Sequence, residues 1–289
     1  MPIRSAPNSS FVTEQTVKRT RAYSHDSSKP HQQAARESHR SVPANEETTV
    51  VTSVFEPKNL FLSALPAVEQ NRLRASLAFH RLPQGHVLQE PEQRIEHVYF
   101  IESGMISLVA MMQDGAQIET ATLGREAILG SLSALGNHKA GSRAIVQIDA
   151  TAWRMPVADF RAAIGQSPML RKMALLSSEL MLAQMQQTAA CNALHTADRR
   201  LCRWIVQIRD RIDDDVIRLT HDFLAQMLAV RRPTVSLIAY SLQQAGLIKY
   251  QRGKITILDL AGLERGACEC VGALREKTHR IIADVPDSR

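Results

Sequence analysis

The spacing of apolar residues divides most of this chain into a strand-rich part and a helix-rich part. Between residues 86 and 156, short runs alternate apolar and other side chains, as half-buried strands do. From Pro168 to about Asn192 the apolar residues recur at helical spacing, and shorter helical stretches follow. The pattern therefore predicts an α+β protein in which an antiparallel β structure precedes the helices.

The strand-rich part is expected to form an antiparallel β sandwich or jelly roll. Turn signals, among them Ser103-Gly104 and Asp114-Gly115, separate the runs, and residues 59–82 before them favour one or two short helices. Many short strands at this spacing are typical of a jelly roll, so we assign residues 56–167 to one β-sandwich domain. The predicted strands cover residues 86–90, 97–103, 104–112, 116–123, 143–149 and 151–156.

The helix predicted over residues 168–193 is long enough to join two copies of the chain. Pro168 suits the first helical turn, where its missing N–H has no partner to lose. Such a long helix beside a small sandwich favours a homodimer through residues 168–193. Packing on its own sandwich remains the alternative. The stripe in question consists of Leu170, Met173, Leu176, Ser177, Leu180, Met181, Gln184 and Gln187.

Residues 219–258 carry the pattern of a helix, a tight turn, a second helix and a basic hairpin. Thr220 is a good N-cap for the first helix, whose apolar residues recur at helical spacing. The turn at Ala229-Val230 has no glycine, so a left-handed residue there must be of another type. The apolar set of this helix consists of Phe223, Leu224, Met227 and Leu228.

The second helix is expected to begin near Pro233 and to end near Gly246, which suits the position just after a helix. The hairpin that follows has the basic tip Arg252-Gly253-Lys254. This layout is typical of a winged helix–turn–helix, which lays its second helix in the DNA major groove. We assign it to residues 194–275, opened by a helix over 198–212. The buried stripe of the second helix is expected to be Val235, Ile238, Ala239 and Leu242.

The residues expected to contact double-stranded DNA lie at the starts of both helices and on the hairpin. Arginine can hold guanine O6 and N7, or a phosphate, through two parallel hydrogen bonds, and hydroxyl groups do so more weakly. The hairpin tip is expected on the phosphate backbone. An ordinary helical pair with a solvated basic face is the alternative interpretation. The candidates are Thr220, His221, Arg231, Arg232, Thr234, Ser236, Arg252 and Lys254.

The composition of the chain bears on its location in the cell and on the nature of its two ends. The chain has 35 Lys and Arg against 29 Asp and Glu, a formal net charge of +6 that is compatible with a polyanionic partner. No apolar run approaches the ~20 residues of a membrane span, and the N-terminus lacks a signal-peptide core. We therefore expect a cytoplasmic protein without membrane contact. Residues 1–55, poor in apolar side chains, predict a disordered tail. Residues 276–289 are assigned to a second tail.

No motif of catalysis stands out. The sequence has no nucleophile elbow, phosphate-binding glycine loop or dinucleotide-binding fingerprint, so no catalytic residues are expected. A ligand-sensing module that acts through protein contacts is the second hypothesis. The basic start of the second helix and the basic hairpin argue against it, because a protein-only module has no need of them.

The succession of a jelly roll, a long helix and a C-terminal winged helix resembles the Crp/Fnr family of bacterial transcription regulators. The resemblance covers roughly residues 59–260 and includes the whole 219–258 segment without a gap. It implies a homodimer that binds near-palindromic promoter DNA, with RNA polymerase as a further partner. Familiar members have a glutamate where Pro233 stands, so their target sequence is not expected here. The sandwich glycines that match are Gly85, Gly104, Gly115, Gly124 and Gly130.

The same resemblance implies a possible small-molecule effector, but cyclic AMP is not expected. Members that bind cyclic nucleotides hold them with a Gly-Glu pair, an Arg-Ser/Thr pair and a Thr-Ser pair on the dimer helix. Here Arg125 separates the glycine from the glutamate, and Ala144 follows the second arginine. We therefore expect a different ligand or none. The pocket candidates are Arg125, Glu126, Ser142, Arg143, Gln186 and Gln187.

The four cysteines do not resemble a disulfide framework. Oxygen-sensing members of the family need an N-terminal cysteine cluster, and no cysteine precedes Cys191, so no iron–sulfur cluster is expected. Cys268 and Cys270 lack a second ligand pair at zinc spacing. We expect them to be two partly buried thiols and expect no metal site, with a redox role left open.

Overall fold

The structure, a computed structural model, describes residues 55–113, 115–212 and 214–284. The predicted N-terminal tail lies outside the described residues except for Phe55, and so does Asp114 of the predicted turn. The Phe55 ring packs edge-on against Trp153, with ring centroids 5.0 Å apart. Contacts with the sheet therefore begin at the first described residue.

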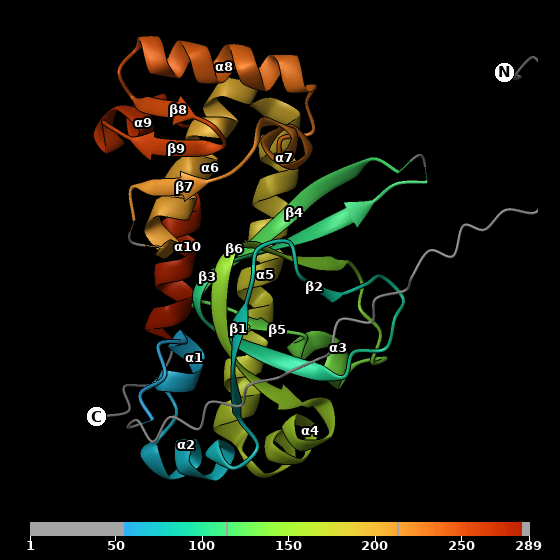
Figure 1. The fold of residues 1–289 in the computed structure, drawn as a ribbon. Helices are drawn as coiled ribbons and strands as arrows, with labels where there is room; N and C mark the ends of the chain where they lie inside the picture. Colours follow the sequence, from blue (N-terminus) through green and yellow to red (C-terminus); the bar gives the residue numbers. More distant parts are fainter. Residues whose placement is uncertain (1–54, 114, 213, 285–289) are drawn as a thin grey trace, which may run out of the picture. The chain divides into compact units, whose positions relative to one another are not determined.

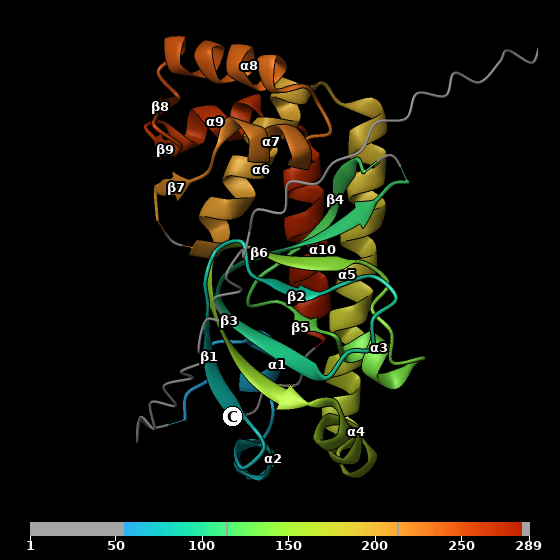
Figure 2. The same cartoon turned by 45° about the vertical axis from the view of Figure 1, so that its right-hand side comes forward.

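The first part of the described chain is an antiparallel sheet flanked by short helices, as the alternating pattern predicts (Figure 1). Its strands pair in the order β1-β6-β3-β4, with β2 on β6 and β5 on β3. The long strands bend, so that the sheet folds over on itself around an apolar interior (Figure 2). The elements are α1 (Leu60–Ser63), α2 (Ala67–Arg74), β1 (Ala78–Leu82), β2 (Val87–Gln89), β3 (His97–Met111), β4 (Gln117–Leu123), β5 (Ile128–Leu129), α3 (Ser131–Leu135), β6 (Arg143–Pro156) and α4 (Val157–Gln166).

Two pairs of neighbouring predicted strands each form one long strand, β3 and β6. Gly104 explains the first difference, because its φ of 78° bends β3 without reversing the chain. A Cβ at Gly104 would lie 2.2 Å from the carbonyl oxygen of Asp149, so only glycine fits this close approach of β3 to β6. Strand β1 also falls within residues 59–82, where only helices are predicted.

Helix α5 (Pro168–Leu194) packs most of its predicted stripe against the protein's own sheet. The hydroxyl of Ser177 accepts a hydrogen bond from the backbone N–H of Ile128 at 2.8 Å. The amide of Gln184 donates to the hydroxyl of Thr122 at 2.8 Å. The alternative interpretation of this stripe, packing within one protomer, is therefore the one that the structure supports.

A different face of α5 is exposed. Leu175 and Leu182, seven residues apart, are 56% and 55% exposed, and Ala189 continues the same line after another seven residues. Whatever meets this face has to come from outside the described part of the protomer. The apolar line that α5 exposes is therefore not the stripe that the periodicity singles out.

The helix-rich part forms a winged helix–turn–helix with a third strand, since β7, β9 and β8 pair in that order. Its core includes Leu201, Trp204, Ile205 and Ile208 of the helix that opens the domain. Met105 and Val109 of β3 belong to the same core, so the sheet and this domain share an interior. The elements are α6 (Ala197–Ile212), β7 (Val216–Arg218), α7 (His221–Met227), α8 (Arg232–Gln244), β8 (Ile248–Gln251), β9 (Lys254–Ile257), α9 (Leu260–Gly266) and α10 (Cys270–Ala283).

Helix α10 runs past the boundary at residue 275 that the sequence suggests. Residues 276–283 are helical rather than a tail, and Ile281 is buried. The helix packs along α5, and Lys172 of α5 donates to the backbone carbonyl of Asp284 at 2.9 Å. Within the described ranges, no helix has both the length and the apolar character needed to cross a membrane.

Candidate DNA-binding surface and sensor region

The first helix and the turn after it form as the sequence predicts. The hydroxyl of Thr220 caps α7 by accepting from the backbone N–H of Phe223 at 3.3 Å. Ala229 has a φ of 49°, which confirms that a residue other than glycine takes the left-handed conformation in this turn. The N–H of Val230 then bonds to the carbonyl of Ala225 at 3.0 Å and closes the helix.

Helix α8 is also bounded as predicted. Pro233 lies in its first turn, and Gly246 follows its C-cap with a φ of 71°. The N–H of Gly246 bonds to Gln243, and the N–H of Leu247 bonds to Leu242, which is the hydrogen-bond pattern of a glycine-terminated helix. The buried face consists of Val235, Ala239 and Leu242, with Ile238 partly buried.

The opposite face of α8 is open to solvent. Arg231 and Arg232 are exposed at its start, and Thr234 is partly exposed beside them. Leu237 and Tyr240 are 69% and 59% exposed on the following turns. Tyr240 is absent from the sequence-based candidates, although its helical spacing from Pro233 and Leu237, opposite the buried stripe, could have indicated it.

The hairpin formed by β8 and β9 carries a basic outer surface. Arg252 and Gly253 both have positive φ, at 50° and 71°, as a tight two-residue hairpin turn requires. Lys254 pairs with Arg218 of β7 across the sheet, and Lys249 is exposed on β8. Over residues 216–258 the sequence has six Lys and Arg residues and a single acidic residue. This surface therefore suits a polyanion.

Two of the DNA-contact candidates are also used inside the domain. The ring of His221 stacks on that of Tyr250, with centroids 4.2 Å apart and planes 17° apart. Nδ1 of His221 shares a hydrogen bond with the Ser236 hydroxyl at 3.0 Å. The hydroxyl of Tyr250 donates to the carbonyl of Leu219 at 3.2 Å. These contacts join α7, α8 and the hairpin, so they fix the recognition helix relative to the wing.

The candidate effector residues do not gather around one point. Arg143 and Glu126 each form an ion pair, but with other residues and not with each other. Arg143 holds Glu90 of the segment after β2 with two hydrogen bonds, at 2.8 and 2.9 Å. Glu126 instead pairs with Arg211 at the end of α6, at 2.6 Å, with both side chains largely buried. Arg125 also contacts Arg211, because its guanidinium group donates a hydrogen bond to the backbone carbonyl of Arg211 at 3.5 Å.

The remaining effector candidates lie apart as well. Ser142 is partly exposed next to Arg143, and Gln186 is exposed on α5. Gln187 donates to the sulfur of Cys270 at 3.0 Å. The inside of the folded sheet is lined by aliphatic side chains, and Met181 and Met185 of α5 pack against them. A polar hollow of about 410 Å³ lies elsewhere, and its lining includes Glu90, Arg94, Glu96 and Arg154.

A buried carboxyl group links the sheet to the DNA-binding domain. Glu119 of β4 accepts hydrogen bonds from the Ser107 hydroxyl and, at 3.0 Å, from the indole N–H of Trp204 on α6. Burial raises the pKa of Glu119 to about 7, against the opposing effects of these two donors and of nearby Arg203 and Arg211. Its protonation state is therefore set by the contact between the two domains.

The structure brings together cysteines that the sequence leaves apart. Cys191 and His195 meet Cys268 and Cys270. The signal that could have indicated this is the spacing of Cys191 and His195, four residues apart at the end of a helix. Burial raises the pKa of the Cys191 thiol to about 12 and also raises that of Cys268, so as free thiols they are poor nucleophiles.

Two domain profiles match this chain. Residues 79–167 match the cyclic nucleotide-binding domain, and residues 199–266 match the Crp-like helix-turn-helix domain. Among curated relatives, the chain is 25% identical over 177 residues to the global nitrogen regulator of Nostoc sp. (strain PCC 7120). That match covers 58% of this chain and 79% of the relative. The global nitrogen regulator of Synechococcus elongatus is 22% identical over 199 residues, covering 65% and 89%.

Solved structures of similar proteins confirm the predicted architecture. A CRP-family transcriptional regulator from Thermus thermophilus superimposes with a TM-score of 0.57 at 18% identity, over 65% of this chain and 96% of that chain. The c-di-GMP responsive global regulator CLP from Xanthomonas campestris gives a TM-score of 0.56 at 14% identity, over 67% and 99%. At these identities the likeness concerns the fold, an antiparallel sheet domain followed by a long helix and a winged helix–turn–helix.

Proposed function

This chain belongs to the Crp/Fnr family of transcription regulators, which are DNA-binding proteins rather than enzymes, and we propose that it reads a near-palindromic promoter site as a homodimer. The observation that carries the proposal is a recognition helix that begins with exposed Arg231 and Arg232 beside a basic wing. In a winged helix–turn–helix, this end of the helix enters the major groove.

The exposed face of α5 supports the homodimer. Leu175, Leu182 and Ala189 recur every seven residues, the repeat of two helices that pack along each other. Exposed leucines in one line are costly in water unless a partner covers them. A seam within residues 168–193 would hold two DNA-binding domains so that their recognition helices stand about 34 Å apart, one turn of DNA. A two-fold symmetric protein then matches an inverted repeat.

We assign base reading to the start and outer face of α8. Arg231 and Arg232 can each donate two hydrogen bonds to the O6 and N7 atoms of a guanine, and Thr234 adds a hydroxyl group. Leu237 and Tyr240 extend the same exposed face and offer apolar contacts to thymine methyl groups. Ser236 and His221 act by holding the helix against the wing, in addition to any contact with DNA.

We assign phosphate binding to the wing and to the N-terminus of α7. Arg252 and Lys254 lie at the tip of the hairpin, and Arg218 and Lys249 add charge on the same small sheet. Thr220 stands at a helix N-terminus, where backbone N–H groups favour an anion. Contacts of this kind set the position of the protein and carry no base preference. RNA polymerase is the further partner that we propose, in the cytoplasm.

We propose that cyclic AMP is not the effector. Its phosphate and ribose would have to displace the Arg143–Glu90 pair and the Glu126–Arg211 pair, and Ala144 has no hydroxyl to offer. Cyclic AMP at ~1 mM should leave the melting temperature unchanged, and a rise of several degrees would overturn this assignment. Arg125, Ser142, Gln186 and Gln187 remain candidates for contacts with another small ligand.

The experiment for the main proposal is selection of bound fragments from random duplex DNA by the full-length protein. The salt concentration should be ~0.15 M, where non-specific attraction is modest. The proposal predicts enrichment of an inverted repeat whose half-sites are one helical turn apart, or a multiple of it. Mutation of Arg232 to Ala in the same selection should relax one base position in each half-site.

The alternative function is a sensor that acts through protein contacts alone. No enrichment together with no binding to any duplex at ~0.05 M salt would favour it and would contradict the proposal. Enrichment of a single half-site by a monomer would retain DNA reading but contradict the dimer. The two parts of the proposal are thereby tested separately.

A further inference from the structure

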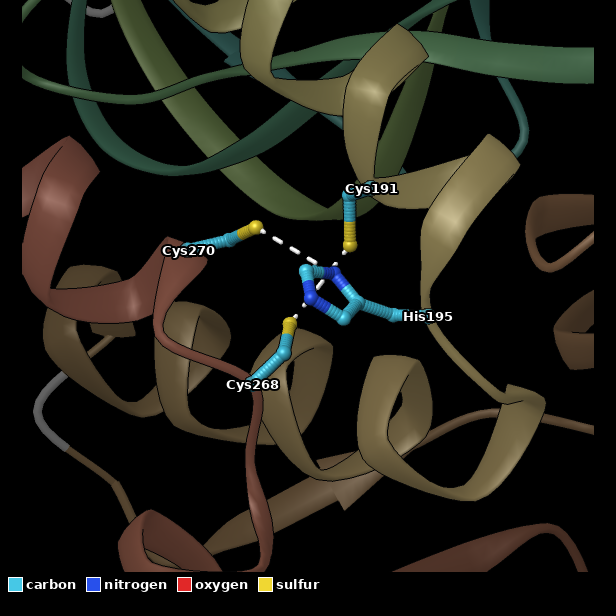
Figure 3. Close-up of side chains that lie close together, drawn as sticks. All are labelled: Cys191, His195, Cys268 and Cys270. Atoms are coloured by element: carbon cyan, nitrogen blue, oxygen red, sulfur yellow. Dashed lines mark hydrogen bonds between the residues drawn. The ribbon is translucent and has the colours of Figure 1, made fainter.

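Two pairs of metal-binding side chains, far apart in the sequence, meet where α5 lies against the start of α10 (Figure 3). Cys191 lies in the last turn of α5, and His195 directly follows that helix. Cys270 is the first residue of α10, and Cys268 lies two residues before it. All four ligand atoms lie within 4.8 Å of one another. Three sulfurs and an imidazole nitrogen are a ligand set typical of zinc. We call these four residues the Cys–His cluster.

The distances within the Cys–His cluster suit one tetrahedral ion. Sγ of Cys191 is 3.5 Å from Sγ of Cys268, and Sγ of Cys270 is 3.6 Å from Nδ1 of His195. With Zn–S bonds of about 2.3 Å and a Zn–N bond of about 2.0 Å, tetrahedral geometry places sulfurs about 3.8 Å apart and sulfur and nitrogen about 3.5 Å apart. The two measured distances agree with these values to within a few tenths of an ångström. The two ligand atoms that lie farthest apart, within 4.8 Å, have to approach each other by about 1 Å.

Residues around the Cys–His cluster orient its ligands as the surroundings of a metal do. Nε2 of His195 bonds to a carboxylate oxygen of Glu269 at 3.0 Å, so that Nδ1 faces the sulfurs. A metal-bound histidine usually donates its other N–H to a carboxylate in this way, which fixes the tautomer and the ring. The amide of Gln187 donates to the sulfur of Cys270 at 3.0 Å, as an outer hydrogen bond to a metal ligand does.

The charge around the Cys–His cluster gives an independent argument. Arg200 and Arg203 are only 7% and 5% exposed, and the Nε of each has no hydrogen-bond partner among the described residues. Neither forms an ion pair with a carboxylate in those residues, and both interact electrostatically with Cys191. Arg203 also lies near the buried carboxyl group of Glu119, whereas no carboxylate is among the groups that affect Arg200. Buried cations need a compensating charge. One divalent ion with three thiolates and a neutral imidazole leaves one net negative charge, which would balance one of the two arginine charges.

We propose that Cys191, His195, Cys268 and Cys270 bind one structural zinc ion that fastens the end of α5 to the start of α10. Four protein ligands complete a tetrahedral shell, so the ion stabilises structure rather than activating water. The three thiols lose their protons when the ion binds. Neutral thiols alone would leave the convergence of four ligand atoms without an explanation, and the buried charge of Arg200 without a compensating one.

The position of the site gives the ion a mechanical role. Only His195 and Thr196 connect α5 to α6, and the ligands lie on both sides of that connection. The ion therefore limits how far the DNA-binding domain can turn away from α5. This role in DNA binding rests on the function proposed above. Zinc binding itself does not, and it is measured without DNA.

The first experiment uses the unmodified full-length protein, purified under reducing conditions without a metal-affinity tag. Elemental analysis should find one zinc per chain. After removal of zinc with a chelator, added Co²⁺ should give the visible absorption of a tetrahedral ion with a strong thiolate charge-transfer band, and one equivalent of Zn²⁺ should abolish it. Because no residue is changed, failure of a variant to fold cannot obscure the result.

Two variants then test the ligands, with a matched control. Cys270→Ser should weaken Co²⁺ and Zn²⁺ binding by at least about 100-fold, and Glu269→Gln by about 10- to 100-fold through the histidine. Cys202→Ser should leave both unchanged, because Cys202 is a buried cysteine of the same domain that lies outside the Cys–His cluster. Removal of zinc should also speed amide exchange at residues 192–197 by about tenfold or more.

Several results would overturn the proposal. One is unmodified protein that holds no stoichiometric zinc and gives no thiolate–cobalt band. Another is a mass deficit of two hydrogens without metal, which would indicate a Cys191–Cys268 disulfide in place of an ion. Iron with acid-labile sulfide in the purified protein would assign the four ligands to an iron–sulfur cluster instead.

Discussion

The proposed DNA-reading surface and the Cys–His cluster are built in opposite ways. The first comes from one continuous stretch, residues 219–258, and it presents cations to solvent. The second joins side chains as far apart as Cys191 and Cys268, 77 residues along the chain, and it buries its sulfurs. The comparison teaches that a function held by neighbouring residues leaves a pattern in the sequence. A function assembled by tertiary packing does not.

A second contrast separates the surface of the protein from the interior that its two domains share. The recognition helix and wing are fixed by local contacts such as the His221–Tyr250 stack. The DNA-binding domain is attached to the sheet by a buried polar contact, Glu119 with Trp204, and by the Glu126–Arg211 pair. Changes at the surface should therefore alter DNA binding alone, whereas changes in the shared interior should alter stability.

The largest effect is expected from the exposed face of α5. Leu182→Glu places a charge in the proposed seam, so the protein should become monomeric and lose about 10²- to 10⁴-fold in affinity for a two-half-site duplex. Light scattering and fluorescence anisotropy measure the two changes. Leu132→Glu is the matched control, because Leu132 is 55% exposed on α3. A Leu182→Glu variant that remains dimeric would place the seam elsewhere.

The next effect concerns the shared interior. The pKa of Glu119 is raised from 4.5 to about 7, so the folded state binds its proton more tightly than the unfolded state. The free energy of unfolding should therefore fall by roughly 3 kcal/mol as the pH rises from about 4.5 to about 7. Glu119→Gln keeps an acceptor for Trp204 but cannot ionise, so it should lose this pH dependence. Urea unfolding at pH 5 and pH 8 measures it.

The matched control for Glu119→Gln is Glu276→Gln, a change at an exposed glutamate on α10. This variant should keep the pH dependence of the unmodified protein. If Glu119→Gln shows that same dependence, the carboxyl group of Glu119 is not the buried link between the two domains that its contacts indicate.

A smaller effect is expected on the recognition helix. Arg232→Ala should lose ~1–3 kcal/mol at the selected site and relax the preference at one base position. Its affinity for random duplex should change less. Arg280→Ala, at an exposed arginine on α10, is the control and should bind both duplexes as the unmodified protein does. If the variant loses the same affinity for selected and for random duplexes, Arg232 contacts a phosphate group and not a base.

The smallest effect is expected at the wing tip. Lys254→Ala removes one cation from the hairpin, so it should weaken binding to every sequence alike. It should also reduce the slope of log affinity against log salt by about one. Titrations at several salt concentrations measure this slope. An unchanged slope would mean that Lys254 does not lie on the phosphate backbone.

Local rules explain how much of the DNA-binding domain could be predicted. Thr220 caps a helix because its hydroxyl reaches an N–H three residues on, and Gly246 ends one because it tolerates a positive φ. The left-handed conformation at Ala229 meets the condition that the turn sets, because the turn contains no glycine to take it. These rules operate within a few residues, so one sequence is enough to apply them.

Elsewhere the sequence could not distinguish arrangements that satisfy the same local pattern. Gly104 takes a positive φ either in a turn or in a bend, and only the close approach of Asp149 shows that β3 continues through it. The stripe of α5 that contains Ser177 is apolar enough for a dimer seam or for the protein's own sheet. Glu126 could have faced an effector, but its partner Arg211 is 85 residues away.

If this protein reads a specific DNA sequence through α8, its affinity must depend on that sequence, and a direct comparison of affinities tests this. The measurement is the Kd of the full-length protein for the selected inverted repeat and for a shuffled duplex of the same composition, at ~0.15 M salt. Base reading by α8 should give at least about 10³-fold tighter binding to the inverted repeat. Equal affinity for the two duplexes would contradict it.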